Sequence, residues 1–202
     1  MKTFINILTF ISLIIVINSC KSEVISNIDK TSDSFVISGG IEDWVNLDRM
    51  EIILGTYVND EFYDFKSAPI KSNGTFYFIF PTLNEQNLVP IVDLENVSGD
   101  SSILINNPTT KGILASFYIS NKEHNSQEIL NHRLDISGDS VRVYKIDFVF
   151  CNDIVDVTGE ITVDNITMIY NLHYNKGWNK RVIVKNEITS VEPSGYKWLA
   201  GH

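Results

Sequence analysis

The chain has 202 residues, of which 16 are Lys or Arg and 25 are Asp or Glu, so its formal net charge is −9. Nucleic-acid binding needs a clustered basic surface, and the sequence has no basic run, which excludes a nucleic-acid partner.

The N-terminus has the layout of a secretory signal peptide. Lys2 precedes an apolar run over residues 4–17 that only three polar residues interrupt. A basic start, an apolar run of about 7–15 residues and a small residue at the cut describe such a signal, whereas a membrane-spanning helix needs about 20 apolar residues. We predict that residues 1–19 are removed, which leaves 183 of the 202 residues.

The segment Ile17-Asn18-Ser19-Cys20 resembles a lipobox, the cleavage motif of bacterial lipoproteins. Ile17 and Ser19 fit the motif, whereas Asn18 departs from the commonest residue at a tolerant position. The resemblance implies that the thiol of Cys20 takes up lipid, with acyl chains such as palmitate. Two or more acyl chains hold a protein on a membrane stably. The alternatives are an ordinary signal peptide with a chance cysteine, or an uncleaved anchor.

A lipidated Cys20 predicts both an address and a partner. Residues 20–33 would form a lipidated tether, and the protein would sit in the cell envelope with a membrane as its partner. The outer membrane is the favoured location, with the domain facing the periplasm or the outside. Cys151 would then have no cysteine to pair with. We predict that it is a buried, small hydrophobe, because a nucleophile would need a nearby base and a lowered pKa.

From Ser34 onward, short β-branched and aromatic runs alternate with turn residues, which predicts an all-β protein. Residues 82–88 and 122–132 are predicted as short helices or loops. The predicted strands are residues 35–38, 50–57, 68–71, 75–80, 102–105, 113–120, 141–151, 155–163, 167–174, 180–184 and 187–191.

Two turns predict hairpins. Asn73-Gly74 and Asn175-Lys176-Gly177 each lie between two consecutive predicted strands, and Asn-Gly supplies the positive φ angles that tight hairpins demand. One face of the strand after the first turn is predicted to lie in the core, because it carries Phe76, Phe78 and Phe80.

Residues 106–112 are polar and contain Pro and Gly, so they are the best candidate for a domain boundary. We predict two packed immunoglobulin-like β-sandwich modules, over residues 34–106 and 112–202. A single larger sandwich is the alternative.

Several motifs resemble those of uncharacterised cell-envelope lipoproteins of Bacteroidota. They are Ser34-Phe-Val-Ile-Ser-Gly-Gly-Ile, Glu51-Ile-Ile-Leu-Gly-Thr-Tyr, Ser72-Asn-Gly-Thr-Phe, Tyr170-Asn-Leu-His-Tyr-Asn-Lys-Gly-Trp-Asn and Pro193-Ser-Gly-Tyr-Lys-Trp. The resemblance implies an envelope lipoprotein with immunoglobulin-like or transthyretin-like β modules. It carries no activity and no catalytic residue.

The polar residues give no recognisable catalytic or metal-binding pattern. No two of the histidines at 124, 132, 173 and 202 have the i,i+2 or i,i+4 spacing of paired metal ligands. His173 is predicted to be half-exposed, and Ser38-Gly39-Gly40 to be a strand-end turn. An acidic set could bind calcium or flank a glycosidic bond, but a solvated surface is favoured. Its members are Asp147, Asp153, Asp156, Glu160 and Asp164.

Aromatic residues leave a binding role open. Trp44, Trp178 and Trp198 could form a stacking platform for sugars, although packing in a core or against a turn is the favoured interpretation. Asp139-Ser140-Val141 resembles an O-glycan attachment site of the same phylum.

The sequence therefore predicts a non-enzymatic, cofactor-free lipoprotein with a structural or binding role. The first alternative is a surface module that binds a glycan or a protein through an exposed aromatic patch. The second is a hydrolase with convergent acids or a Cys–His pair. The third is an adhesin or pilus subunit with an open edge strand.

Overall fold

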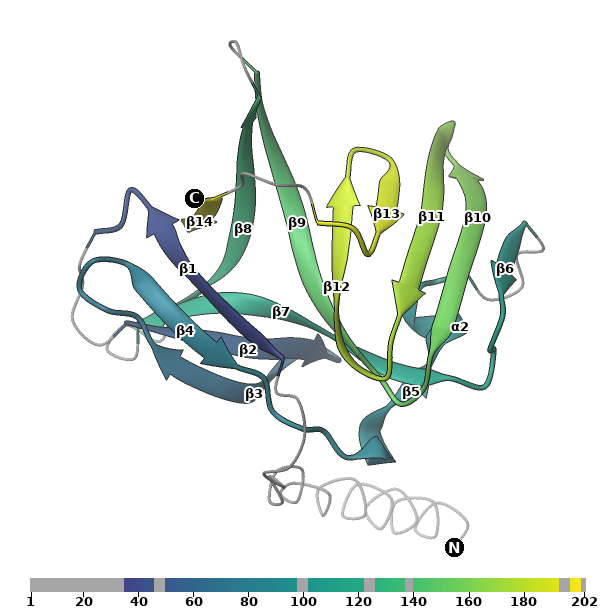
Figure 1. Cartoon of the computed structure of the whole chain (residues 1–202), viewed down its shortest axis with the longest axis horizontal. Coiled ribbons are helices and arrows are strands. Elements are labelled where there is room, and N and C mark those ends of the chain that lie inside the picture. The colour runs from purple at the N-terminus through teal and green to yellow at the C-terminus, as the bar shows by residue number, and fades with distance from the viewer. Residues whose placement is uncertain are drawn as a thin grey trace, which may run out of the picture.

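The computed structural model describes residues 35–45, 50–97, 102–121, 126–136, 140–192 and 197–200. The signal peptide, Cys20 and the tether lie outside the described residues, as do His124, His202 and Asp139. For His132 the structure describes the backbone alone. The described residues form an all-β sandwich fold of two open sheets, so the predicted fold class is confirmed (Figure 1).

The only helical elements within the described ranges are short. They are the 3-10 helix η1 (Glu85–Asn87) and α2 (Ile91–Leu94). The strands are β1 (Val36–Glu42), β2 (Met50–Val58), β3 (Glu61–Pro69), β4 (Thr75–Ile79), β5 (Val89–Pro90), β6 (Ile103–Ile105), β7 (Lys111–Asn121), β8 (Ser126–Ile136), β9 (Ser140–Cys151), β10 (Val155–Val163), β11 (Ile166–Tyr174), β12 (Gly177–Val184), β13 (Glu187–Thr189) and β14 (Lys197–Ala200).

The long strand β7 joins the two sheets. Its first half pairs with β9, from Gly112↔Cys151 to Ser116↔Asp147, and its second half pairs with β2 and β8. On one side the order continues through β8, β14, β1 and β4; on the other it continues through β9, β12, β13, β11, β10 and β6. These two groups form the left and right halves of Figure 1.

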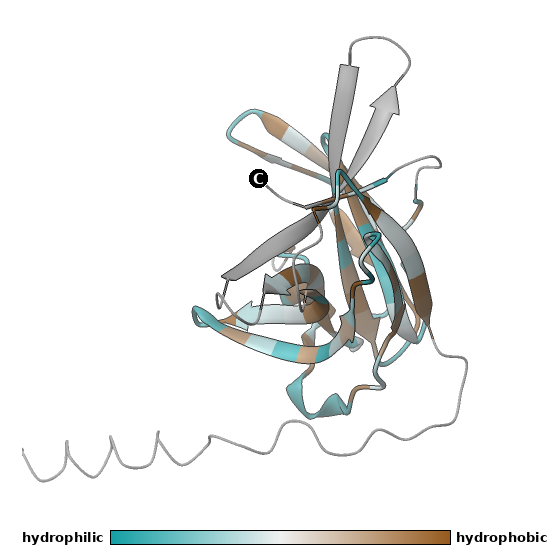
Figure 2. Ribbon diagram, turned by 90° about the vertical axis from the view of Figure 1, so that its left-hand side faces the viewer, coloured by the Kyte–Doolittle hydropathy of each residue, from teal (hydrophilic) through white to brown (hydrophobic). Residues whose placement is uncertain are grey.

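The central strands β7, β9 and β12 are buried on both faces, and each face belongs to a different hydrophobic core. Along β9, Phe148 and Phe150 point into the first core, whereas Val149 and Cys151 point into the second. Side chains alternate between the faces of a strand, so one strand can serve two cores. Figure 2 shows hydrophobic and hydrophilic residues alternating along the strands.

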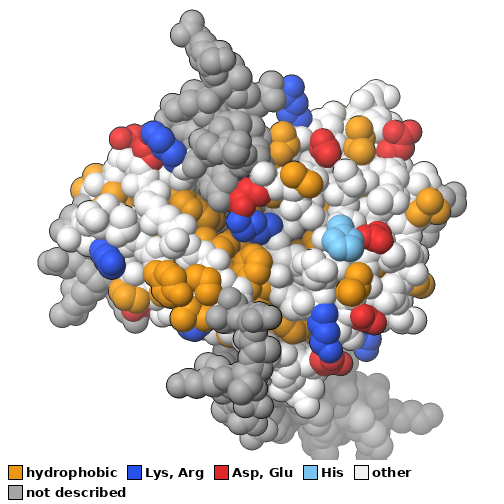
Figure 3. Space-filling view, viewed as in Figure 1, with side chains coloured by type: hydrophobic (Ala, Val, Ile, Leu, Met, Phe, Trp, Pro, Cys, Tyr) orange, Lys and Arg blue, Asp and Glu red, His pale blue; other side chains and the backbone are white. Residues whose placement is uncertain are grey.

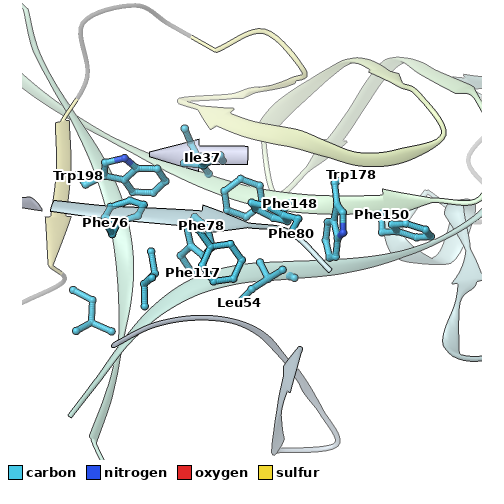
Figure 4. Packing of buried hydrophobic residues seen from close by; sticks show 14 of the residues in the cluster. Ile37, Leu54, Phe76, Phe78, Phe80, Phe117, Phe148, Phe150, Trp178 and Trp198 are labelled. Atoms are coloured by element: carbon cyan, nitrogen blue, oxygen red, sulfur yellow. The ribbon is translucent and has the colours of Figure 1, made fainter. Parts of the chain in front are cut away.

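The first core is built mainly from aromatic rings (Figure 4). Phe117 lies at its centre, with ring centroids 4.6 Å from Phe148 and 4.9 Å from Phe78. Phe80 lies 4.8 Å from Phe148. Such edge-to-face and tilted pairs add about 0.5–1.5 kcal/mol each beyond the burial of their area. Phe76, Phe78 and Phe80 are all buried, so the predicted phenylalanine stripe is confirmed.

The two cores do not divide at residues 106–112. Phe78 and Phe148 share the first core, and Ile103 and Leu172 share the second, so each core draws on both sides of that segment. Strand pairing also crosses it, because β2 pairs with β7 and β6 pairs with β10. The cores separate instead across the β7–β9–β12 sheet.

Both predicted hairpins are wrong, although their turns exist. At Gly74 the chain turns with φ of +77°, but β4 pairs with β1, and β3 pairs with β2. Likewise β13 lies between β11 and β12, in parallel to β11, so these two strands do not pair. Short-range turn chemistry fixed the turns, whereas long-range pairing decided the neighbours.

Three further predictions need correction. Of the predicted helix or loop over 122–132, residues from 126 onward belong to strand β8. Strand β3 was predicted only at its end. Ser38-Gly39-Gly40 lies inside β1 instead of in a turn. A Cβ on Gly39 would come within 2.5 Å of the Trp198 indole, so this glycine lets the ring pack directly on the strand.

Strand β4 offers a matched test of the first core. Phe78 is 0% exposed and Tyr77 is 58% exposed. We expect Phe78→Ala to lower the free energy of unfolding by about 3–5 kcal/mol, because it removes a buried ring together with its contacts and leaves a cavity. Tyr77→Ala should change it by about 0.5 kcal/mol or less. Chemical denaturation measures both, and similar losses for the two variants would contradict the assigned strand faces.

Candidate functional site

Two of the three tryptophans lie in the first core. Trp178 and Trp198 are 9% and 3% exposed, and the Trp178 Nε1 donates to the Pro81 carbonyl at 2.6 Å. Trp44 is partly buried and packs on the turn at Gly74, where an added Cβ would lie 2.7 Å from the Trp44 Cβ and Cγ. The structure therefore places the tryptophans in the core and against a turn, so they do not form a platform of several exposed rings.

His173 and Asp156 form a polar pair on the outward face of β10 and β11. The His173 Nδ1 lies 2.5 Å from the Asp156 Oδ1, and the two side chains are 60% and 40% exposed. The Asn106 side-chain amide donates to the other oxygen of Asp156, and the Asp156 backbone N–H donates back to Asn106. The prediction of a surface histidine is confirmed. The predicted acidic surface holds for Asp153, Glu160 and Asp164 as well.

Cys151 lies in the second core, on the opposite side of its sheet from the outward face that carries His173. Its side chain is buried, and it is a free thiol as predicted. Burial raises the pKa of Cys151 to about 12, and the Glu95 carboxylate adds to the rise. The thiolate is the nucleophilic form of cysteine, so this residue is poorly suited to covalent catalysis.

A buried ion cluster lies on the second-core face of the central sheet. It consists of Glu95, Asp147, Arg181 and Tyr174. The Arg181 Nε donates to the Glu95 Oε2 at 2.9 Å, and an Arg181 terminal nitrogen lies 3.4 Å from the Asp147 Oδ2. Tyr174 donates to the Glu95 Oε1 at 2.8 Å. Ser116 donates to the Asp147 Oδ1 at 2.6 Å.

Each member of the ion cluster comes from a different element. Glu95 follows α2, Asp147 is in β9, Tyr174 ends β11 and Arg181 is in β12. Glu95 and Asp147 are 1% and 0% exposed, so the cluster is shielded from water. Burial opposes the charge of Arg181, but Glu95, Tyr174 and Asp147 together raise the pKa of its guanidinium. Burial, followed by Glu95, holds the pKa of Tyr174 well above its usual value.

The ion cluster corrects one prediction from the sequence, and the cluster itself was not predicted. Asp147 was placed with the solvated acids, but it is fully buried. A signal existed, because Asp147 interrupts the apolar run Ile146-Asp147-Phe148-Val149 of a strand that is buried on both faces. Similarly, Arg181 lies two residues before Ile183, so the two side chains share the inward face of β12. Nothing in the sequence marks Glu95 as their partner.

The outward side chains of β1 and β4 form a second candidate site, the β1–β4 outer face. Val36 pairs with Ile79 and Ser38 pairs with Tyr77, which sets these four side chains beside one another. Val36, Tyr77 and Ile79 are 39%, 58% and 39% exposed. Figure 3 shows hydrophobic side chains gathered over this part of the molecule. Of the remaining outward positions, Gly40 and Thr75 are uncharged, whereas Glu42 at the end of β1 is acidic and pairs with Lys197 at 2.7 Å.

The β2–β3 hairpin carries the other exposed aromatic residues. Tyr57 packs on Phe62 and Tyr118, with ring centroids 5.1 Å and 5.9 Å away. Tyr57 pairs with Phe62, whereas Tyr63 pairs with Thr56, so the two exposed tyrosines point to opposite faces. The hairpin thus presents single rings and no two-ring platform.

Comparison of the chain with protein-family models, curated proteins and solved structures finds no match. Within the part of the chain that the structure describes, no helix has the length and apolar character needed to span a bilayer, and no three His, Cys, Asp or Glu side chains come together as a set that could hold a metal ion.

Breaking the ion cluster tests its structural role. We expect Arg181→Met to destabilise the fold by about 3–5 kcal/mol near pH 7, because Glu95 and Asp147 lose the buried cation that pairs with both. Lys145, which is 46% exposed and also contacts Asp147, provides the control: Lys145→Met should cost about 0–1 kcal/mol. Chemical denaturation near pH 7 measures both, and equal losses for the two variants would contradict this role.

The buried thiol has its own test. We expect Cys151 in the folded protein to resist alkylation by iodoacetamide at pH 8, because its raised pKa keeps it protonated and burial excludes the reagent. The same protein in denaturant should react fully. Mass spectrometry follows the reaction, and rapid labelling of the folded protein would contradict the assignment.

Proposed function

We propose that this chain is a lipid-anchored protein of the bacterial cell envelope that acts through binding or structural support, without catalysis. The observation that carries the proposal is the apolar N-terminal run, which ends in Ile17-Asn18-Ser19-Cys20 and precedes the folded β domain. A lipid on Cys20 would hold that domain at a membrane through the intervening segment. The outer membrane is the favoured location.

The chemistry of the described domain supports a non-catalytic role. The buried acids Glu95 and Asp147 both pair with Arg181, and Asp147 also contacts Lys145. Cys151 is buried in the second core, while His173 points outward from β11, so these two residues do not form the Cys–His pair that a hydrolase would use. The buried acids and the buried thiol, which could otherwise take part in catalysis, thus contribute to the packing and pairing of the fold.

A surface module that binds a glycan or a protein is the second candidate. Exposed Tyr57 and Tyr77 favour it, because tyrosine offers a stacking ring and a hydrogen-bonding hydroxyl on one side chain. The burial of Trp178 and Trp198 and the separate faces of the two hairpin tyrosines count against a broad sugar platform. An open edge at β4 supports the adhesin alternative only weakly, since this strand has five residues.

The anchor is tested by two single-cysteine variants of the full chain. We expect Cys20→Ser to abolish incorporation of labelled palmitate, because the thiol that carries lipid is lost. Cys151→Ala is the matched control and should keep the label. Incorporation of palmitate into Cys20→Ser, or an intact leader on the unsubstituted protein, would contradict the anchor at Cys20.

A further inference from the structure

The β1–β4 outer face carries little charge in a chain that is strongly acidic, and its acidic position, Glu42, is paired with Lys197. Val36, Ser38, Tyr77 and Ile79 alternate with buried core residues, so the strands present hydroxyls and apolar groups outward. The net charge of the chain is −9, so a face whose acid is paired with a lysine differs from an unpaired acidic surface. Such a face suits a partner that combines apolar and polar groups.

The segment that follows Cys20 joins the domain at this face. The Phe80 backbone N–H donates to the Phe35 carbonyl at 2.9 Å, and the Phe35 ring lies 4.9 Å from the Phe80 ring. Phe35 is therefore fixed to the first core, and Val36 on the outer face is the next residue. Fourteen residues separate Cys20 from Phe35, and a chain of that length spans at most about 50 Å.

We propose that the β1–β4 outer face rests on the membrane that holds Cys20, with Tyr77 and Ile79 in the interfacial layer. This inference depends on the proposed lipid anchor. An anchor turns the contact into an intramolecular event with an effective concentration in the millimolar range, so a weak surface contact becomes populated. Tyrosine is enriched at the membrane–water interface. The pairing of Glu42 with Lys197 leaves no net negative charge on the outward positions of β1 and β4 that anionic lipid would repel.

The position of the face also orients the rest of the domain. The β10–β11 turn, with exposed Val163 and Ile166, lies at the far upper right of Figure 1, whereas β1 begins near the lower centre. Acidic Asp164 stands between these two side chains and Glu160 is close by in β10. With β1 and β4 on the bilayer, this turn remains available to partners.

Quenching by lipid tests the orientation. Full-length Ser38→Cys and Ile166→Cys proteins would carry a fluorescent maleimide and be reconstituted in vesicles of phosphatidylethanolamine and phosphatidylglycerol with headgroup spin-labelled lipid. Lipidated Cys20 and buried Cys151 should not react. We expect quenching at position 38 to exceed that at position 166 by at least about twofold, because only the first position reaches the interface. Adding Tyr77→Asp to Ser38→Cys should remove the difference.

The outcomes separate the two proposals. Equal quenching at both positions in protein that sediments with vesicles would overturn the orientation and leave the anchor intact. Energy transfer between labels at position 38 on different molecules, without lipid quenching, would assign the face to a second copy and also overturn it. Protein that carries no acyl chain by mass spectrometry and does not sediment would contradict the anchor itself.

Discussion

The rest of the structure depends on the burial of β9 on both of its faces. Alternate residues of this strand enter different cores, with Phe148 in the aromatic core and Val149 in the aliphatic one. A shift of register by one residue would exchange every side chain between the two cores. It would also move Asp147 from its partners Arg181 and Ser116 into a layer of phenylalanines. The pairing of β7, β9 and β12 is therefore specified by packing and by charge together.

The ion cluster contributes more to selecting the strand register of the central sheet than to the stability of the fold. Buried ion pairs often gain less than desolvation costs, and apolar replacements of a whole pair are often tolerated. Glu95 follows α2, whereas Arg181 and Asp147 lie on neighbouring strands, so the cluster ties the segment between the halves to the central sheet. We interpret it as a structural device that fixes where α2 sits over the second core.

Local patterns in the sequence predicted the strands well and their partners poorly. Period-two alternation identified the inward phenylalanines of β4 and the buried position of Cys151, because both depend on neighbours along one strand. The partner of β4 is β1, which lies over thirty residues earlier in the chain. Strand β13 follows both β11 and β12 in the chain but lies between them in the sheet. The ion cluster joins residues up to 86 positions apart, so only Asp147 and Arg181, by their places on inward strand faces, were open to detection.

The central claim is that the lipid on Cys20 sets where this domain works. The most direct measurement is the intact mass of the protein purified from membranes of its own host, followed by sequencing of its N-terminal fragment. The account predicts a mature chain that begins at Cys20 and carries the mass of two or three acyl chains. A chain that begins at Met1, or one that begins at Cys20 with an unmodified thiol, would contradict it.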